Sequence, residues 1–294
     1  AMAFAISSGV SPQAGIYTAI VAGVVVSTLG GSKFQVSGPT GAFVVVVSGI
    51  VLKYGQSGLL LCTLMAGALL VFLGASGLGS AVKYIPRPVV VGFTNGIAVL
   101  IASTQIKDFF GFHGANPGGF LERMQDLSRN AGSMNPAATS LAVGCLLLLI
   151  VFRHYRKRFP STVVALFAGT AVVVLFKLSV ETVGSKFGGI PAQLPHPDIP
   201  DIHLADLPQL LSPALTVAFL GALESLMSAV VADRMGGDKH NPNVELVAQG
   251  AGNIISPIFG GIPITGAIAR TATNIRAGGK TPVEGIIHGF TLLA

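Results

Sequence analysis

Apolar runs close to bilayer-spanning length recur along the whole chain and alternate with short polar segments. A helix needs about 20 apolar residues to cross a hydrocarbon core about 30 Å thick, whereas a membrane β-barrel would show short segments of alternating polarity. The pattern therefore predicts an all-α, polytopic membrane protein. The expected helical segments are 1–10, 14–29, 40–52, 58–78, 87–107, 136–152, 161–178, 209–231, 244–259, 264–275 and one that begins at 282.

Composition supports a lipid environment. Hydrophobic residues make up 51% of the 294 positions and charged residues 10%, against about 25% charged residues in soluble domains. The 38 glycines suit helix interfaces at which backbones approach closely. The net charge of +6 comes from basic residues between apolar runs, without an aromatic-interleaved basic patch, so no nucleic-acid partner is expected. Cys62 and Cys145 lie inside apolar runs and have no metal-ligand spacing.

Lysine and arginine are distributed unevenly between alternate loops, which predicts the orientation because cytoplasmic loops carry an excess of these residues. One set of loops holds eleven of them: Lys33, Lys83, Arg87, Arg153, Arg156, Lys157, Arg158, Arg234, Lys239, Arg276 and Lys280. The other set holds six, Lys53, Lys107, Arg123, Arg129, Lys177 and Lys186, alongside seven acids. We expect the first set to be cytoplasmic, with 153–158 as its strongest marker, in a multi-pass protein of the plasma membrane or bacterial inner membrane.

Both ends of the chain fall inside apolar segments. Residues 1–6 are apolar and no charged flank precedes them, and 286–294 stop before they could span a bilayer. A signal peptide would begin with basic residues, which are not found here. We therefore expect a fragment of a longer protein, truncated at both ends.

Two short helical segments, 40–52 and 264–275, follow stretches that resemble each other. Residues 30–42 and 260–267 both contain Gly-Gly, residues around a proline, and then Thr-Gly-Ala. By the expected orientation, the first short helix starts from the cytoplasmic side and the second from the outside. Interrupted segments at corresponding positions of two halves point to a transporter's binding site, and helix N-termini suit an anion. The alternative is that these stretches are only loops between ordinary spans.

Six motifs lie in order along the chain: Ser11–Tyr17, Val36–Thr40, Ala222–Leu226, Asp238–Asn241, Glu245–Gly250 and Gly266–Thr271. In these motifs the chain resembles the SulP family of sulfate permeases and related anion transporters, and most of all its bacterial branch with dicarboxylate and proton-coupled members. The resemblance implies two inverted seven-helix repeats, of which 1–294 would be a partial transport domain. It also implies a core subdomain at about 1–78 and 209–294, a gate subdomain at about 79–208, a following cytoplasmic STAS domain, and a homodimer.

The resemblance further places a substrate site beside Glu224 and Arg270. The residues it implies for substrate binding are Phe4, Thr40, Gly266, Ala267, Ala269 and Arg270, and those for coupling to a proton, or to sodium, are Glu224 and Ser228. No cofactor, metal site or catalytic residue is expected.

These residues also have plainer interpretations. A carboxylate within a span costs roughly 2.5–3.5 kcal/mol on insertion scales, so Glu224 should be paired, protonated or facing water. It could titrate during transport, or form a purely structural salt bridge with Arg270. Thr40 could donate to an anion or simply cap a helix, and Ser228 could pack between helices.

Four other residues also have plainer interpretations. Phe4 could close the site or face lipid or a neighbouring helix. Asp233, His240 and Glu245 lie at a boundary expected to be cytoplasmic and lack metal-ligand spacing, so we interpret them as solvated loop residues.

The leading hypothesis is a secondary carrier for a small anion that works by alternating access with proton coupling. An uncoupled anion exchanger, a channel or a voltage-driven motor on the same scaffold is the main alternative. Arg270 argues against a neutral nucleobase as the substrate. An intramembrane enzyme is disfavoured because the spans lack a Ser/His/Asp, paired-Asp or HExxH arrangement. Sulfate, bicarbonate, chloride, nitrate and dicarboxylates all remain open as substrates.

Overall fold

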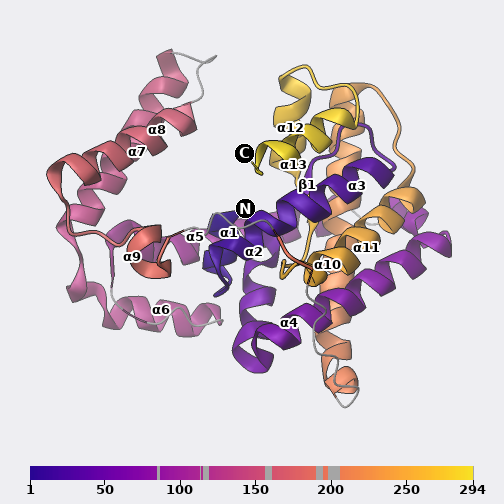
Figure 1. The fold of residues 1–294 in the computed structure, drawn as a ribbon, viewed down its shortest axis with the longest axis horizontal. Helices are drawn as coiled ribbons and strands as arrows, with labels where there is room; N and C mark the ends of the chain where they lie inside the picture. Colours follow the sequence, from indigo (N-terminus) through magenta and orange to yellow (C-terminus); the bar gives the residue numbers. More distant parts are fainter. Residues whose placement is uncertain are drawn as a thin grey trace. The chain divides into compact units, whose positions relative to one another are not determined.

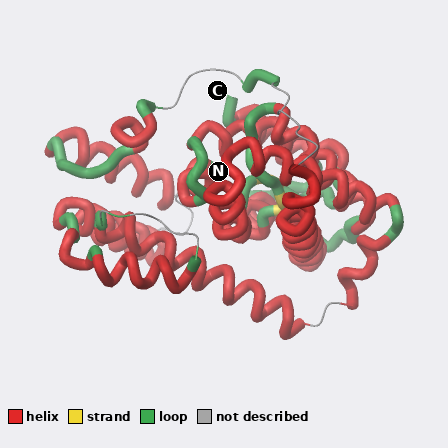
Figure 2. Tube along the Cα trace, turned by 90° about the horizontal axis from the view of Figure 1, so that it is seen from below, coloured by secondary structure: helices red, strands yellow, loops and turns green. Residues whose placement is uncertain are grey.

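A computed structural model describes residues 1–84, 87–112, 114, 119–155, 161–189, 195–197 and 206–293. Helices make up most of this described part, together with one small pair of strands (Figures 1 and 2). The chain divides into two compact units, one formed by Ala1–Ile97 with Ile190–Ala294 and the other by Ala98–Gly189. The two units are described separately below, and their roles as core and gate remain predictions.

The first unit contains the two interrupted segments. Its elements are α1 (Met2–Ser7), α2 (Pro12–Tyr17), the π-helical turn η1 (Thr18–Ala22), α3 (Gly23–Leu29), β1 (Ser37–Gly38), the 3₁₀ turn η2 (Gly41–Phe43), α4 (Val44–Ala75), the 3₁₀ segment η3 (Leu78–Tyr84), the start of α5 (Arg87–Phe110), α10 (Leu207–Gly236), α11 (Pro242–Ile258), β2 (Thr265–Gly266), α12 (Ile268–Arg276) and α13 (Val283–Thr291).

The expected spans largely correspond to these helices. The expected spans at 40–52 and 58–78 both overlap α4, which bends where Gly55 adopts φ +70° and ψ −174°, a conformation that glycine reaches without strain. By length and composition, three helical stretches of the described chain could cross a membrane: Pro12–Leu29, Gly41–Ala75 and Leu207–Gly236. The expected helix at 264–275 is wrong at its start, because β2 occupies its first residues and α12 begins only at Ile268.

The core of the first unit lies where α4 packs against α10 and α11 (Figure 1). Leu59 and Leu70 of α4, Leu210 of α10 and Leu246 of α11 are almost completely buried there. Large apolar side chains on the outer faces are exposed, including Phe72 at 66%. Such exposure is unfavourable in water and is expected for residues that face lipid.

The second unit contains the rest of α5, α6 (Phe120–Arg129), the 3₁₀ turn η4 (Ala131–Ser133), α7 (Pro136–Tyr155), α8 (Ser161–Phe176) and α9 (Val183–Phe187). Helices α7 and α8 pack against each other. The sequence pattern did not indicate α6, whose Arg123 is buried and donates to Ser103 Oγ at 2.9 Å. Of the charge marker at 153–158, residues 156–158 lie outside the described residues, and the orientation remains a prediction.

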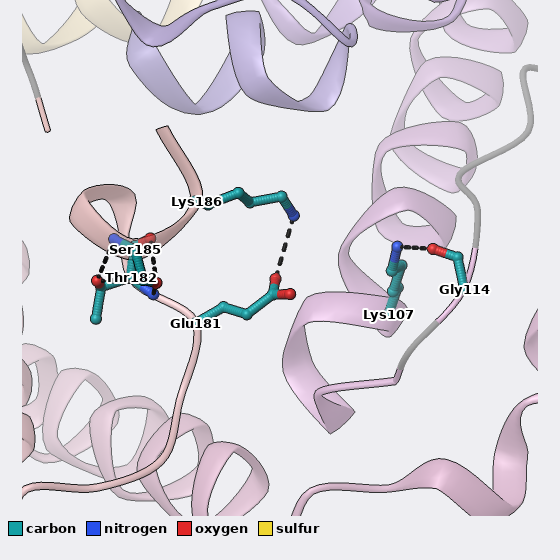
Figure 3. A network of polar contacts seen from close by, with 6 residues as sticks. All are labelled: Lys107, Gly114, Glu181, Thr182, Ser185 and Lys186. Atoms are coloured by element: carbon teal, nitrogen blue, oxygen red, sulfur yellow. Dashed lines mark hydrogen bonds and ion pairs between the residues drawn. The ribbon is translucent and has the colours of Figure 1, made fainter. Parts of the chain in front are cut away.

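Polar contacts in the second unit link residues that lie near one another in its connecting segments (Figure 3). Thr182 and Ser185 form a reciprocal capping box at the start of α9, and Lys186 Nζ lies 3.2 Å from Glu181 Oε2. The ammonium group of Lys107 donates to the carbonyl oxygen of Gly114. The Lys186–Glu181 ion pair is exposed, so it contributes little stability, about 0–1 kcal/mol.

The close approach of α4 to α11 generates a prediction about stability. A Cβ atom on Gly67 would lie 2.7 Å from the backbone nitrogen of Ile254, whereas a Cβ atom on Gly49 of the same helix would meet nothing within 4 Å. Gly67→Ala should therefore destabilise the protein by about 1–3 kcal/mol through overpacking, and Gly49→Ala should not. Unfolding of the two variants in detergent checks this, and equal stabilities would contradict the packing described here.

Candidate functional site

The two interrupted segments meet as a short antiparallel ribbon. Strand β1 pairs with β2, with Ser37 opposite Gly266 and Gly38 opposite Thr265, and the Ala267 nitrogen donates to the Val36 carbonyl at 3.1 Å. A helix follows each strand: η2 and α4 after β1, and α12 after β2. Because the strands are antiparallel, these helices leave the ribbon in opposite directions, and their N-termini flank the ribbon.

Helix α10 holds the second strand in place. Ser225 Oγ lies 2.7 Å from Thr265 Oγ1 and accepts a hydrogen bond from the Gly266 nitrogen at 3.1 Å. Thr265 Oγ1 is also 3.3 Å from the Gly221 carbonyl. A Cβ atom on Gly266 would lie 2.1 Å from Gln35 Nε2, so any larger residue would have to displace the Gln35 side chain. The predicted site residue Gly266 is thus a point of close approach.

Glu224 contacts the beginning of the first interrupted helix. Thr40 Oγ1 donates to Glu224 Oε2 at 2.9 Å, while Thr40 itself is the residue before η2 and makes no side-chain capping bond. Thr40 is thus the N-cap residue by position, but its hydroxyl caps no helix nitrogen and donates to Glu224 instead. A carboxylate beside a helix N-terminus is favoured by the helix dipole.

Arg270 joins the second interrupted helix to the first interrupted segment. Its Nη2 donates to the Pro39 carbonyl at 2.5 Å and its Nη1 to the Ser37 carbonyl at 3.4 Å. Within the described chain, no ion pair under 4 Å links Arg270 to Glu224 or to another acid, so the salt bridge considered from the sequence is not formed. The guanidinium donates hydrogen bonds to the carbonyl oxygens of Ser37 and Pro39 instead.

A cavity of about 380 Å³ adjoins Arg270. The first unit alone lines it, with side chains from α12, α13 and the residue before β1: Val36, Ala269, Arg270, Thr273, Asn274, Ala277, Glu284 and His288. The predicted site residue Ala269 is exposed towards it, whereas Ala267 is buried at the start of α12. Nothing in the sequence pattern had singled out His288 or Asn274.

Ser228 and Phe4 are the two remaining predicted site residues. Ser228 is fully buried, and its hydroxyl lies 3.4 Å from Thr271 Oγ1, which accepts a hydrogen bond from the Val36 nitrogen at 3.1 Å. Ser228 therefore supports the junction of α12 with the ribbon. Phe4 lies half-buried in α1.

The interpretation of Glu245 as a solvated loop residue is wrong. Its side chain is fully buried and accepts hydrogen bonds from the backbone nitrogens of Gly31 and Ser32 and from the amides of Gln35 and Gln249. The carboxylate thus serves as the partner for unpaired donors of the first break. A sequence cannot show this, because the donors Gly31, Ser32 and Gln35 lie more than 200 residues away.

Two neighbouring acids form ion pairs of their own, and the interpretation of His240 as a solvated loop residue is also wrong, because its side chain is only 8% exposed. Asp233 Oδ2 lies 2.7 Å from His240 Nδ1, and Asp238 Oδ2 lies 2.8 Å from Lys33 Nζ. Hydrogen bonds from Lys33 and from the Lys239 nitrogen lower the pKa of the exposed Asp238 carboxyl below its ordinary value. The described residues contain no group of three His, Cys, Asp or Glu side chains placed to hold a metal ion.

Comparison with known proteins shows that the chain is similar to a family of transporters. The model of the sulfate permease family matches residues 1–294. YvdB of Bacillus subtilis (strain 168) is 46% identical over 294 residues, covering 99% of this chain and 56% of YvdB. The bicarbonate transporter BicA of Picosynechococcus sp. is 32% identical over 305 residues, covering 100% of this chain and 53% of BicA. The chain thus spans about half the length of these relatives.

A solved structure gives the same fold. The transmembrane domain of a cyanobacterium bicarbonate transporter BicA matches with a TM-score of 0.88 at 32% sequence identity, covering 99% of this chain and 76% of that domain. The described helices therefore have the arrangement of a transporter membrane domain.

Ser225 provides a test of the ribbon's anchoring. Ser225→Ala should leave the buried Gly266 N–H without its acceptor, at a cost of about 1–3 kcal/mol, and should loosen β2. We expect faster hydrogen–deuterium exchange in a peptide covering 262–268, measured by mass spectrometry. Ser212→Ala, an exposed change on the same helix, serves as the control. If exchange in Ser225→Ala matched that of the control, α10 would not anchor β2.

Proposed function

Because the chain belongs to the sulfate permease family, we propose that the protein carries a small oxyanion, sulfate or bicarbonate, across a membrane. The chain is a multi-pass membrane protein by its apolar helices and its family. The family's description names sulfate and the relative BicA is a bicarbonate transporter, which supports these two anions as first candidates. We place the protein in the plasma membrane, as a homodimer that works by alternating access.

One observation carries the proposal: two helix N-termini flank a shared ribbon with Arg270 between them. Each N-terminus has unpaired N–H groups and about half a positive charge. A guanidinium has five N–H donors, and the contacts of Arg270 within the described chain use two directions. The remaining donors suit an anion more than a neutral or cationic substrate.

Coupling is assigned to Glu224. A carboxylate within an apolar span is costly unless it can change its charge or find a partner, and such residues mark proton pathways in transporters. The Thr40 hydroxyl links this carboxylate to the first half of the anion site. Protonation of Glu224 would alter that hydrogen bond, so proton loading and anion loading would influence each other. Sodium could take the proton's role at the same group.

Arg270 can be tested against a basic residue of the same helix. Arg270→Ala should lower the apparent affinity for sulfate or bicarbonate by about 10- to 100-fold, because charge-assisted hydrogen bonds contribute about 1.5–3 kcal/mol. Arg270→Lys should recover part of the loss, since it keeps the charge without the planar fork. Arg276→Ala, exposed in the last turn of α12, should behave as wild type. Uptake into proteoliposomes measures all three, and wild-type affinity in Arg270→Ala would remove Arg270 from the site.

Glu224→Gln separates coupling from binding. The substitution keeps the shape and most hydrogen bonds, so a proton gradient should no longer drive accumulation while anion counterflow continues. Both assays are run on the same reconstituted protein, with Glu181→Gln of the second unit as an exposed control. Accumulation that still follows the proton gradient in Glu224→Gln would place coupling elsewhere. A wild type that exchanges anions with no response to proton or sodium gradients would indicate an uncoupled exchanger or channel.

A further inference from the structure

Helix α11 carries a row of buried polar side chains that the proposed transport mechanism does not use. Glu245, Gln249, Asn253 and Ser256 are spaced by four, four and three residues, which places them on one face of the helix. All four are at most 1% exposed. A buried polar group is retained at a cost unless it has partners, so the partners of this row indicate its role.

The first two residues of the row hold the first interrupted segment. Glu245 accepts from the Gly31 and Ser32 nitrogens at 3.0 and 3.2 Å and from Gln35 Nε2 at 2.7 Å. Gln249 Nε2 donates both to Glu245 Oε1 and to Ser37 Oγ, each at 2.9 Å. Ser37 is the first residue of β1, and its carbonyl accepts from Arg270. Gln249 is therefore one residue removed from the Arg270 contact.

The other two residues hold the second interrupted segment. The Asn253 amide pairs with the backbone of Ile264 at both of its atoms, since Nδ2 donates to the Ile264 carbonyl at 2.8 Å and the Ile264 nitrogen donates to Oδ1 at 3.0 Å. This side chain satisfies the backbone as a neighbouring strand would, directly before β2. Ser256 Oγ donates to the Ile262 carbonyl at 2.7 Å, and Thr18 of η1 accepts from the Ile262 nitrogen at 2.7 Å.

We infer that Gln249 and Asn253 are positioning residues for the anion site, each acting on one of its two halves from a single rigid helix. The Asn253 amide also donates to the Gln249 carbonyl at 2.8 Å, which joins the two contacts on α11. Neither residue lines the cavity beside Arg270. Their effect is to fix the separation and register of the two helix N-termini. An anion can contact both N-termini only when they are held at a fixed separation. This inference rests on the proposed function, because it assigns these residues to the same site.

Near-isosteric apolar substitutions test the inference. Gln249→Met and Asn253→Leu remove the hydrogen bonds at similar volume. The matched control is Thr63→Val, because Thr63 is also fully buried and its hydroxyl bonds only within α4, to the Leu59 carbonyl. Ser37→Ala removes the partner of Gln249 without changing α11 and gives a second route if an α11 variant does not fold.

The measurements are made on the full chain, reconstituted for uptake and in detergent for binding. We measure KM for radiolabelled sulfate and for bicarbonate, the maximal rate per folded protein, and the Kd from thermal stabilisation by each anion. We expect KM and Kd to rise about tenfold in Gln249→Met, Asn253→Leu and Ser37→Ala, corresponding to about one lost hydrogen bond's net contribution. Thr63→Val should lower thermal stability without a change in KM or Kd.

The outcomes are distinguishable. Unchanged KM and Kd in the folded variants, with only a lower melting temperature, would show a purely structural role and overturn the inference. If neither α11 variant folds, Ser37→Ala decides, and wild-type affinity there overturns the role of Gln249. If the wild type neither binds nor transports sulfate or bicarbonate, the proposed function fails first.

Discussion

Backbone N–H and C=O groups inside a bilayer need a partner from the protein, and the rest of this structure depends on that constraint. Two segments of the first unit leave helical geometry, at 30–40 and at 260–267, and their backbone groups lose their helical partners. They find new partners in each other, through β1 and β2, and in side chains of α10 and α11. The candidate site can form because neighbouring helices supply hydrogen-bond partners for the backbone groups of the two breaks.

The helices packed around the two breaks make different contacts with them. Helix α10 brings Glu224 to the start of the first interrupted helix and Ser225 to the second strand, from adjacent positions. Helix α11 contacts both breaks but not the cavity. These contacts require backbones that approach closely. Glycines such as Gly67 at the α4–α11 interface and Gly266 in the ribbon allow that approach. Helix α10 thus contacts both interrupted segments at their ribbon ends, and α11 contacts both from outside the cavity.

The sequence predicted the class of protein, most helices and the pair of interrupted segments, because these depend on local composition and on motifs that can be read along the chain. It also pointed to Thr40, Glu224, Gly266 and Arg270, which do lie around the ribbon, although their roles remain predictions. It misjudged Glu245, because a carboxylate next to a polar loop resembles a solvated one until its donors are known. It did not foresee β1 and β2, since two-residue strands leave no periodic pattern.

What the sequence by itself determined is therefore the solvent, the helical spans and the chemistry available at the two breaks. Only the tertiary structure decided the pairings: Thr40 rather than Arg270 contacts Glu224, and carbonyl oxygens rather than a carboxylate receive Arg270. The sequence spacing places the row from Glu245 to Ser256 on one helix face, but it does not show which residues this row contacts. The physical reason is that hydrogen bonds act over about 3 Å, and the partners are brought within that distance by packing of segments far apart in the sequence.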